Sequence, residues 1–305
     1  MTMREMSANQ AANQAYVSDR LLPAEPPPAS VRHWSKARIA GIVLMTLWAA
    51  IAIALVVFFI SAWNPALLTR YGPKLLDGLL VTIELVVLSV AIGAVLAGIV
   101  AAGRLSKNRW TRGLAFAFVY FFRGTPLLAQ TFLVYYGAGQ FREVFEAAGL
   151  WWFFRDAFNC AALTFTLNTA AYQAEIYAGA IRGISVGQWE GARALGLSPV
   201  VIFIKVVAPQ ALITALRPLG NEIIFMIKGS AIASVITVYD LLGETRLAFS
   251  RSFDFQVYLW AAGLYLVVVE ALRRLWDAAE RRLTRHLKPA QDSSGQQVVA
   301  EQLGA

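Results

Sequence analysis

The chain contains few charged residues and lacks the polar surface that a soluble protein needs. Only 15% of its 305 residues are Asp, Glu, Lys or Arg, whereas 58% are hydrophobic. Soluble domains carry about a quarter charged residues. This shortage excludes an ordinary soluble globule and predicts an all-α, polytopic transmembrane helical bundle.

Motifs for covalent chemistry are also missing. The single cysteine, Cys160, excludes an internal disulfide and any multi-cysteine metal site. The two histidines, His33 and His286, lie in polar ends outside the hydrophobic runs. The sequence MIKGS at 226–230 lacks the upstream glycines of a phosphate-binding loop. We therefore expect a non-enzyme that binds no cofactor or metal, so any uphill transport must be driven by an ion gradient or by an ATPase on another chain.

Hydrophobic runs long enough to cross a bilayer are present instead. The run 39–62 carries no charge and would extend roughly 36 Å as a helix. We interpret it as a retained anchor, because the polar segment before it is too long for the n-region of a cleaved signal peptide. Together with it, we expect about six spans. The other five are 78–103, a broken span within 113–138, 157–181, 218–240 and 255–272.

The stretch 113–138 can be interpreted in two ways. As one helix it would bury Arg123 near its middle, at a cost of several kcal/mol. Alternatively, Gly124, Thr125 and Pro126 break it, with Thr125 as N-cap and Pro126 as the first helical residue. We favour the break. Residues 105–122 would then form a helix at the inner side or at the membrane interface, and 126–141 a short span.

Basic residues alternate between loops as the positive-inside rule requires. The loop 104–112 carries four basic residues and no acid, whereas the loop 142–156 is slightly acidic. This pattern places both termini and the segment 182–217 in the cytoplasm. We expect the terminal segments 1–38 and 286–305 to be disordered tails.

A polar segment, GQWEGARALGLSPVVIFIKVVAPQ at 187–210, separates two expected spans. Gly196 suits a helix-ending position, and Ser198-Pro199 suits the start of a second helix that Pro209 would end. Connections between packed helices usually need only 2–8 residues. An ordinary loop remains an alternative, but the length favours a functional helix–turn–helix.

Polar side chains also follow the faces of two expected spans. Asn168, Tyr172 and Glu175 share one helix face by their i, i+4, i+7 spacing, and Asn221 and Lys228 lie on one face of the next span, with Ser230 close by. Ionisable groups within spans normally face the bundle interior or a cavity. They could line a path for a solute with two charged ends, or form an interhelical clasp such as Glu175 with Lys228.

Several of these segments resemble the permease subunits of ABC importers, in the branch for polar amino acids and opines. The similarity covers about 70–285 and includes FFRGTPLLAQTFLVYYG, LNTAAYQAEIYAGAIRGIS, GQWEGARALGLS and APQALITALRPLGNEIIFMIKGS, in that order. Glu190, Ala192, Gly196 and Pro209 match the cytoplasmic loop motif of this family. Gly191 and Ala208 depart from it, because Ala and Leu are usual there.

The resemblance implies a five-span permease domain at 70–285, with a coupling loop at 185–210 and 39–62 as an additional span. It implies that the loop docks on a separate ATPase chain, which holds ATP and Mg. The expected docking residues are Gln188, Glu190, Gly191, Ala192, Arg193, Gly196 and Pro209.

The remaining implied partners are a solute-binding protein outside the membrane and a second permease subunit, identical or similar, within the bacterial inner membrane. The alternative function is an ion-coupled secondary transporter or channel for a small polar solute, with Glu84, Glu175 and Glu222 as ion sites. Such a carrier would have no use for the 187–210 loop.

Overall fold

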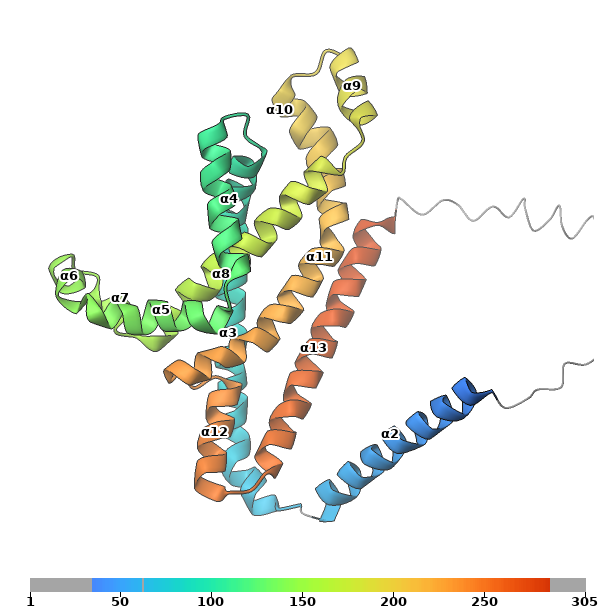
Figure 1. The fold of residues 1–305 in the computed structure, drawn as a ribbon, viewed down its shortest axis with the longest axis vertical. Coiled ribbons are helices and arrows are strands. Elements are labelled where there is room, and N and C mark those ends of the chain that lie inside the picture. Colours follow the sequence, from blue (N-terminus) through green and yellow to red (C-terminus); the bar gives the residue numbers. More distant parts are fainter. Residues whose placement is uncertain (1–34, 62, 286–305) are drawn as a thin grey trace, which may run out of the picture. The chain divides into compact units, whose positions relative to one another are not determined.

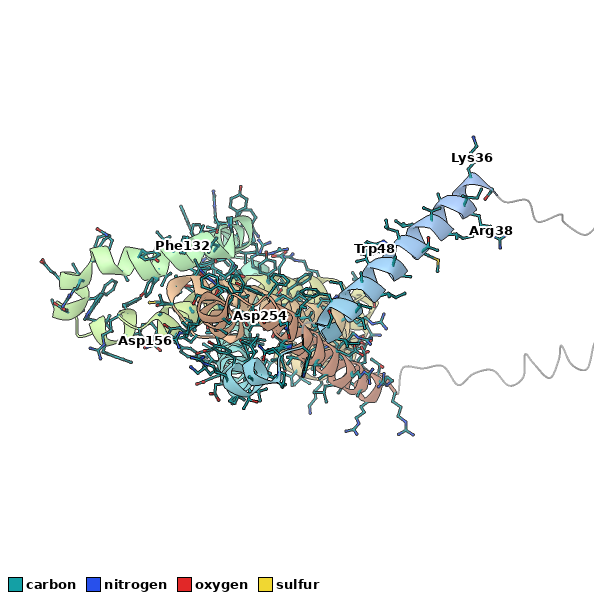
Figure 2. All side chains as sticks on the ribbon, turned by 90° about the horizontal axis from the view of Figure 1, so that it is seen from below. Lys36, Arg38, Trp48, Phe132, Asp156 and Asp254 are labelled. Carbon is teal, nitrogen blue, oxygen red and sulfur yellow. The ribbon has the colours of Figure 1, made fainter. Side chains whose placement is uncertain are left out.

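The computed structural model describes residues 35–61 and 63–285, which form two units. The first unit consists of helix α2 (Lys36–Ser61), which carries Lys36 and Arg38 in its first turn and is apolar on every side beyond it (Figure 2). Uniform apolarity is typical of a helix surrounded by lipid. The helix coincides with the expected anchor at 39–62. The expected tails 1–38 and 286–305 fall almost entirely outside the described residues.

The second unit is a helical bundle built around α3 (Pro65–Leu105) and α8 (Ala157–Arg182), which pack along each other (Figure 1). The other helices of this unit follow in chain order. They are α4 (Arg109–Gly124), α5 (Leu127–Gln140), α6 (Arg142–Ala147), α7 (Trp151–Phe154), α9 (Val186–Ala194), α10 (Pro199–Ile202), η1 (Phe203–Val207), α11 (Ala208–Gly229), η2 (Ser230–Ile236), α12 (Leu241–Ser252) and α13 (Gln256–Leu283).

The all-α fold is confirmed, and its spans can be counted by length and composition. Among the described residues, four helical stretches qualify, and the bent pair α4–α5 makes five. The expectation of about six also included α8. That helix has 26 residues, but Asn, Gln, Glu and several Thr residues lower its hydropathy, and it contributes many buried residues to the bundle. A bundle shields such polar groups from lipid.

Helix α3 begins earlier than expected, because residues 65–77 are helical and do not form an outer loop. The Asn64 side chain accepts a hydrogen bond from the Leu67 amide at 3.2 Å, and Pro65 occupies the first turn. This pairing of an Asn cap with Pro is a strong helix start. Pro73 is accommodated inside the 41-residue helix.

The break between α4 and α5 is confirmed, with a bend of 102°. Thr125 ends α4 and Pro126 is the N-cap of α5, one residue later than expected. The Gln130 side chain stabilises the bend by donating to the carbonyl oxygens of Phe122 and Thr125 at 2.9 and 3.0 Å. Backbone groups freed by the bend therefore keep partners, as a buried break requires.

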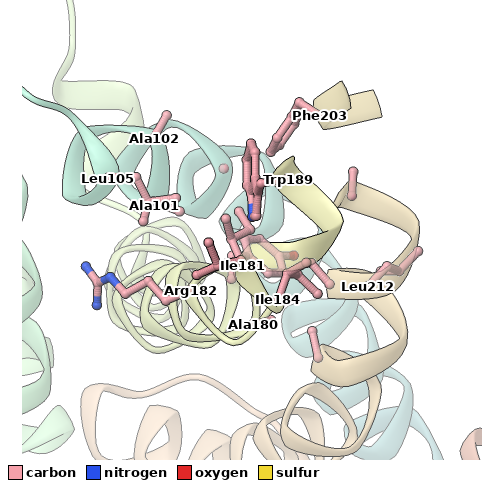
Figure 3. Close-up of a pocket in the computed structure, with 16 residues that line it drawn as sticks. Ala101, Ala102, Leu105, Ala180, Ile181, Arg182, Ile184, Trp189, Phe203 and Leu212 are labelled. Carbon is pink, nitrogen blue, oxygen red and sulfur yellow. The ribbon is translucent and has the colours of Figure 1, made fainter. Parts of the chain in front are cut away.

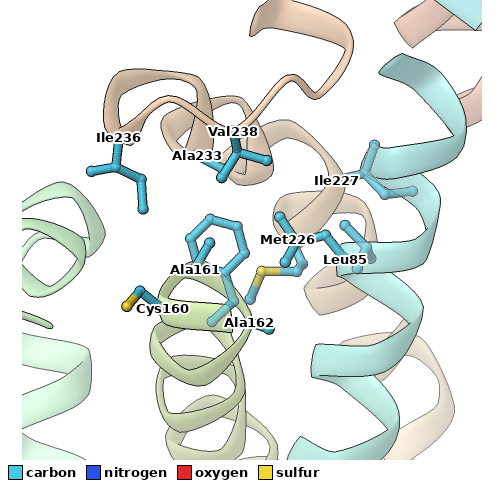
Figure 4. Close-up of a cluster of buried hydrophobic side chains, with 11 residues drawn as sticks. Leu85, Cys160, Ala161, Ala162, Met226, Ile227, Ala233, Ile236 and Val238 are labelled. Atoms are coloured by element: carbon cyan, nitrogen blue, oxygen red, sulfur yellow. The ribbon is translucent and has the colours of Figure 1, made fainter. Parts of the chain in front are cut away.

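The main core lies between α3, α8, α11 and η2 (Figure 4). Phe165 of α8 is fully buried there and is surrounded by aliphatic side chains, among them Leu85 and Met226. This core anchors the central helices, from which the polar side chains described below project.

Helix α12 was not expected from the sequence, and it packs on α3. The Asp240 side chain caps it by accepting a hydrogen bond from the Gly243 amide at 2.8 Å. The Leu241 amide donates to the Thr82 hydroxyl of α3 at 3.0 Å. Gly78 permits this approach, because a Cβ added there would lie 2.8 Å from the Asp240 carbonyl oxygen.

Replacing Gly78 with alanine should therefore destabilise the bundle. The new methyl group meets a backbone carbonyl that cannot rotate away, and overpacking of this kind costs about 2 kcal/mol. Thermal unfolding of the detergent-purified chain measures the effect. Gly98→Ala on the same helix is the matched control, because a Cβ there meets nothing within 4 Å. Equal unfolding temperatures for both variants would contradict the close packing at Gly78.

Candidate functional site: an exposed loop and a charged cavity

The segment 186–207 forms a compact protrusion made of α9, a tight turn, α10 and η1, and α11 follows directly. Gly196 adopts the left-handed conformation (φ 72°) that suits glycine, and its amide donates to the Arg193 carbonyl at 2.9 Å. Ala192 is buried against Ile202 and Val207, so the two halves of the protrusion share a small core. The predicted helix–turn–helix is therefore present, with Gly196 at its turn.

Pro209 does not end the second helix of this protrusion. It lies in the first turn of α11, where proline needs no amide hydrogen bond, and the chain continues through η1 into α11 without a break. The membrane-length stretch that contains the expected span 218–240 accordingly begins earlier, at Pro199, and ends at Ile236, with α11 followed directly by η2. Gln210 links the two ends of the loop by donating to Gln188 Oε1 at 3.3 Å and to the Val206 carbonyl at 2.8 Å.

The other predicted docking residues differ in exposure. Glu190, Gly191 and Arg193 are exposed on α9, whereas Ala192 faces the small core of the protrusion. Among the described residues, the Glu190 carboxylate has no ion-pair partner. Exposed small and charged side chains on a short helix leave its backbone open to close approach by another surface.

A second feature is a cavity of about 350 Å³ between the C-terminal end of α3, α4 and α8. Its charged groups are Arg104, Arg123 and Glu175, and Tyr120 and Tyr172 also line it. Arg104 donates to both oxygens of Glu175, at 3.0 to 3.3 Å. The Arg123 guanidinium lies 5.1 Å from the centre of the Tyr172 ring, close enough for a cation–π contact.

The three polar residues predicted to share one face of α8 therefore have two different roles. Tyr172 and Glu175 line the cavity, whereas Asn168 is buried and donates to the Phe122 carbonyl and to Gln130 Oε1 at 2.9 and 3.0 Å. These bonds tie α8 to the bend between α4 and α5. Glu175 pairs with Arg104 and more loosely, at 3.8 Å, with Arg182, so the considered clasp with Lys228 is not formed.

The predicted residues of α11 do not join this cavity. Asn221 and Lys228 are exposed along α11, and Ser230 is buried at the start of η2, where its hydroxyl donates to the Ile227 carbonyl at 2.8 Å. Asn221 and Lys228 thus lie on an exposed face of α11, whereas the Ser230 hydroxyl makes a hydrogen bond within its own segment.

A buried hydrogen-bond chain between α8 and α11 was not predicted. The Thr169 hydroxyl donates to the Glu222 carboxylate at 3.1 Å and accepts from Gln173 at 3.0 Å. The Tyr177 hydroxyl donates to Gln173 Oε1 at 3.2 Å. The i, i+4, i+8 spacing of Thr169, Gln173 and Tyr177 was a signal for this chain. The chain also explains how the Glu222 carboxylate can be buried, because Thr169 on the neighbouring helix α8 donates a hydrogen bond to it.

Apolar helices of membrane length, with charged side chains kept inside the bundle beside a cavity, are typical of an integral membrane protein with a polar interior. A model of the family "binding-protein-dependent transport system inner membrane component" matches residues 94–285. The match spans more than half of the chain, so the chain belongs to this family. It is therefore a multi-pass permease subunit of the inner membrane and not an enzyme. Family membership also decides against the ion-coupled carrier.

Curated relatives agree with this assignment. The nopaline transport system permease protein NocM of Agrobacterium fabrum is 42% identical, over 71% of this chain and 90% of its own length. The histidine/lysine/arginine/ornithine transport system permease protein HisM of Escherichia coli is 40% identical, over 75% of this chain and 95% of its own length.

A solved structure described as an amino acid ABC transporter with histidines superimposes with a TM-score of 0.64 at 32% identity. The superposition covers 72% of this chain and 99% of that one. A transport system of this kind also comprises an ATPase and a binding protein, which carry the ATP chemistry and the solute capture.

Proposed function

We propose that this permease subunit imports an amino acid or an opine. The observation that carries the proposal is the cavity in which Arg123 and the Arg104–Glu175 pair face one another. An amino acid presents a carboxylate and a cation, and a guanidinium and a carboxylate are their complementary partners. The two similar permeases belong to systems named for nopaline and for basic amino acids, which carry both charges.

The proposed path continues from this cavity along the exposed face of α11. Asn221 and Lys228 lie on that face, and their side chains are open to a neighbouring subunit or to solute. We assign the opposite wall of the path to a second permease subunit, either an identical copy or a related chain. In this assignment Asn168 and Ser230 shape the helices that border the path.

The protrusion formed by α9, α10 and η1 is the proposed coupling loop. Its exposed helix would dock on the ATPase, and closure of the two ATPase chains would move the spans as rigid bodies. The distribution of basic residues supports a cytoplasmic position for this loop and for both termini. Segment 39–62 would then be an additional membrane anchor.

Reconstituted uptake tests the proposal. The full-length permease is placed in phosphatidylcholine vesicles with its ATPase inside and its binding protein outside, and uptake of radiolabelled arginine, histidine, nopaline and octopine is measured. We expect ATP-dependent uptake of one of these solutes, and its loss when either partner is omitted. Uptake that persists without ATPase or binding protein would contradict the coupling, and ATP hydrolysis without uptake of any of the four would contradict the solute class.

A further inference from the structure

A larger cavity, of about 920 Å³, lies beside the coupling loop and has no part in the proposed solute path (Figure 3). Its walls come from the C-terminal third of α3, the C-terminal end of α8, α9, Phe203 of η1 and the first half of α11. The cavity is therefore bordered both by membrane helices and by the segment that would contact the ATPase.

The lining of this cavity is apolar and built from small side chains. Alanines on α3, α8 and α11 form much of the wall, and Gly98 and aliphatic residues complete it. Only Tyr177, Arg182 and Trp189 of the lining residues carry polar side-chain atoms. A polar solute enclosed there would lose most of its hydrogen bonds, whereas a hydrocarbon chain would lose none.

The cavity has one charged residue in its lining. The stem of Arg182 borders it, and Figure 3 shows the guanidinium of Arg182 pointing out to one side. Arg104 donates to both oxygens of Glu175 at 3.0 to 3.3 Å, whereas the Arg182 guanidinium lies 3.8 Å from that carboxylate and donates to the Arg104 carbonyl oxygen at 3.4 Å. The Arg182 side chain is 49% exposed, and the adjacent turn at 104–112 carries four basic residues and no acid.

We propose that this cavity binds an acyl chain of an anionic phospholipid, whose phosphate contacts Arg182. Basic pockets between membrane helices on the cytoplasmic side are suited to anionic head groups, and Trp189 and Tyr177 are residue types that favour the membrane–water boundary. The lipid would come from the inner leaflet of the membrane, and this assignment rests on the cytoplasmic position of the coupling loop in the proposed function. The bound lipid would contact both α3 and α9, and so would stabilise one position of the coupling loop relative to the spans.

Filling the cavity tests the acyl-chain site. Gly98 lies in the cavity wall, and a Cβ added there meets nothing within 4 Å, so we expect the side chain of Gly98→Leu to extend into the cavity. It would displace about two methylenes of the chain, so phospholipid retention should fall about tenfold. Native mass spectrometry of the full-length permease, after exchange into detergent with phosphatidylglycerol, measures retention. Gly263→Leu is the matched control, since it is equally open but lies on α13 away from the cavity.

A second variant tests the head group. Arg182→Gln should still retain lipid but should lose its preference for phosphatidylglycerol over phosphatidylcholine when the two are offered together. An unchanged preference would overturn the assigned phosphate contact. Equal retention by wild type, Gly98→Leu and Gly263→Leu would overturn the acyl-chain site.

Occupancy by a protein segment is a separate outcome. Gly98→Cys in a Cys160→Ala background places one thiol at the cavity wall, so disulfide formation between two copies in membranes would identify the second copy as occupant and overturn the lipid proposal. We expect no disulfide-linked pair of chains in that experiment, whether or not two copies associate elsewhere on their surfaces. Lipid retention is measured on the permease itself, so its result stands even if no solute is imported.

Discussion

Replacing Glu190 with lysine is expected to weaken association with the ATPase about 100-fold, and with it ATP-driven uptake. Glu190 is exposed on α9, and its carboxylate lacks an ion-pair partner among the described residues. The change should therefore leave the permease fold nearly unaffected, since surface substitutions usually alter stability by about 0.5 kcal/mol or less. Reversing a charge at an interface is far more damaging, because a desolvated charge loses its partner. Co-purification of the ATPase and uptake in vesicles measure the two effects.

Two matched variants separate coupling from stability. Glu143→Lys makes the same charge change on the short exposed helix α6 and should leave both co-purification and uptake intact. Gly191→Ala keeps the charge and adds a methyl group where nothing lies within 4 Å, so it should strengthen α9 by about 1 kcal/mol and preserve coupling. Normal coupling in Glu190→Lys would remove Glu190 from the docking surface.

The loop could be predicted in large part because its signals are local. Gly196 occupies the left-handed turn that its lack of a Cβ allows, and Ser198-Pro199 begins the next helix, although the Ser198 side chain makes no cap hydrogen bond. Pro209 gave the wrong boundary because proline is disfavoured in the interior of a helix but not in its first turn. The start of α3 moved from Gly78 to Pro65 for a different reason, because Pro73 is accommodated in the interior of that helix.

Only some of the residues that line the charged cavity could be predicted, because the others lie far away along the chain. Tyr172 and Glu175 could be placed on one face by helical spacing alone. Their partners could not, because Arg104 lies 71 residues from Glu175 and was expected in a basic surface loop. A periodic pattern specifies which side of a helix faces inward, whereas the identity of the opposing side chain depends on how two helices pack. The pairing of Asn168 with the bend at Phe122 escaped prediction for the same reason.

Replacing Glu175 with glutamine should lower both stability and uptake. The variant leaves Arg104, whose side chain is only 14% exposed, without its carboxylate partner. Breaking a fully buried pair costs about 3–5 kcal/mol. Partial exposure reduces this to about 2 kcal/mol here. Thermal unfolding in detergent measures that loss. Glu146→Gln is the matched control, because it breaks the exposed Arg142–Glu146 pair and should cost less than about 1 kcal/mol.

The charge-swapped double variant Arg104→Glu with Glu175→Arg decides whether the pair is a clasp or part of the solute path. Exchanging the two groups restores their attraction but places a guanidinium beside Arg182, so most of the lost stability, and not all of it, should return in either case. Uptake should remain at least about tenfold reduced, because the carboxylate would then project from α3 and meet the wrong end of a bound amino acid. Recovery of uptake together with stability would mean that Glu175 only joins two helices, and the recognition of the solute would then fall to Arg123 and to the exposed face of α11.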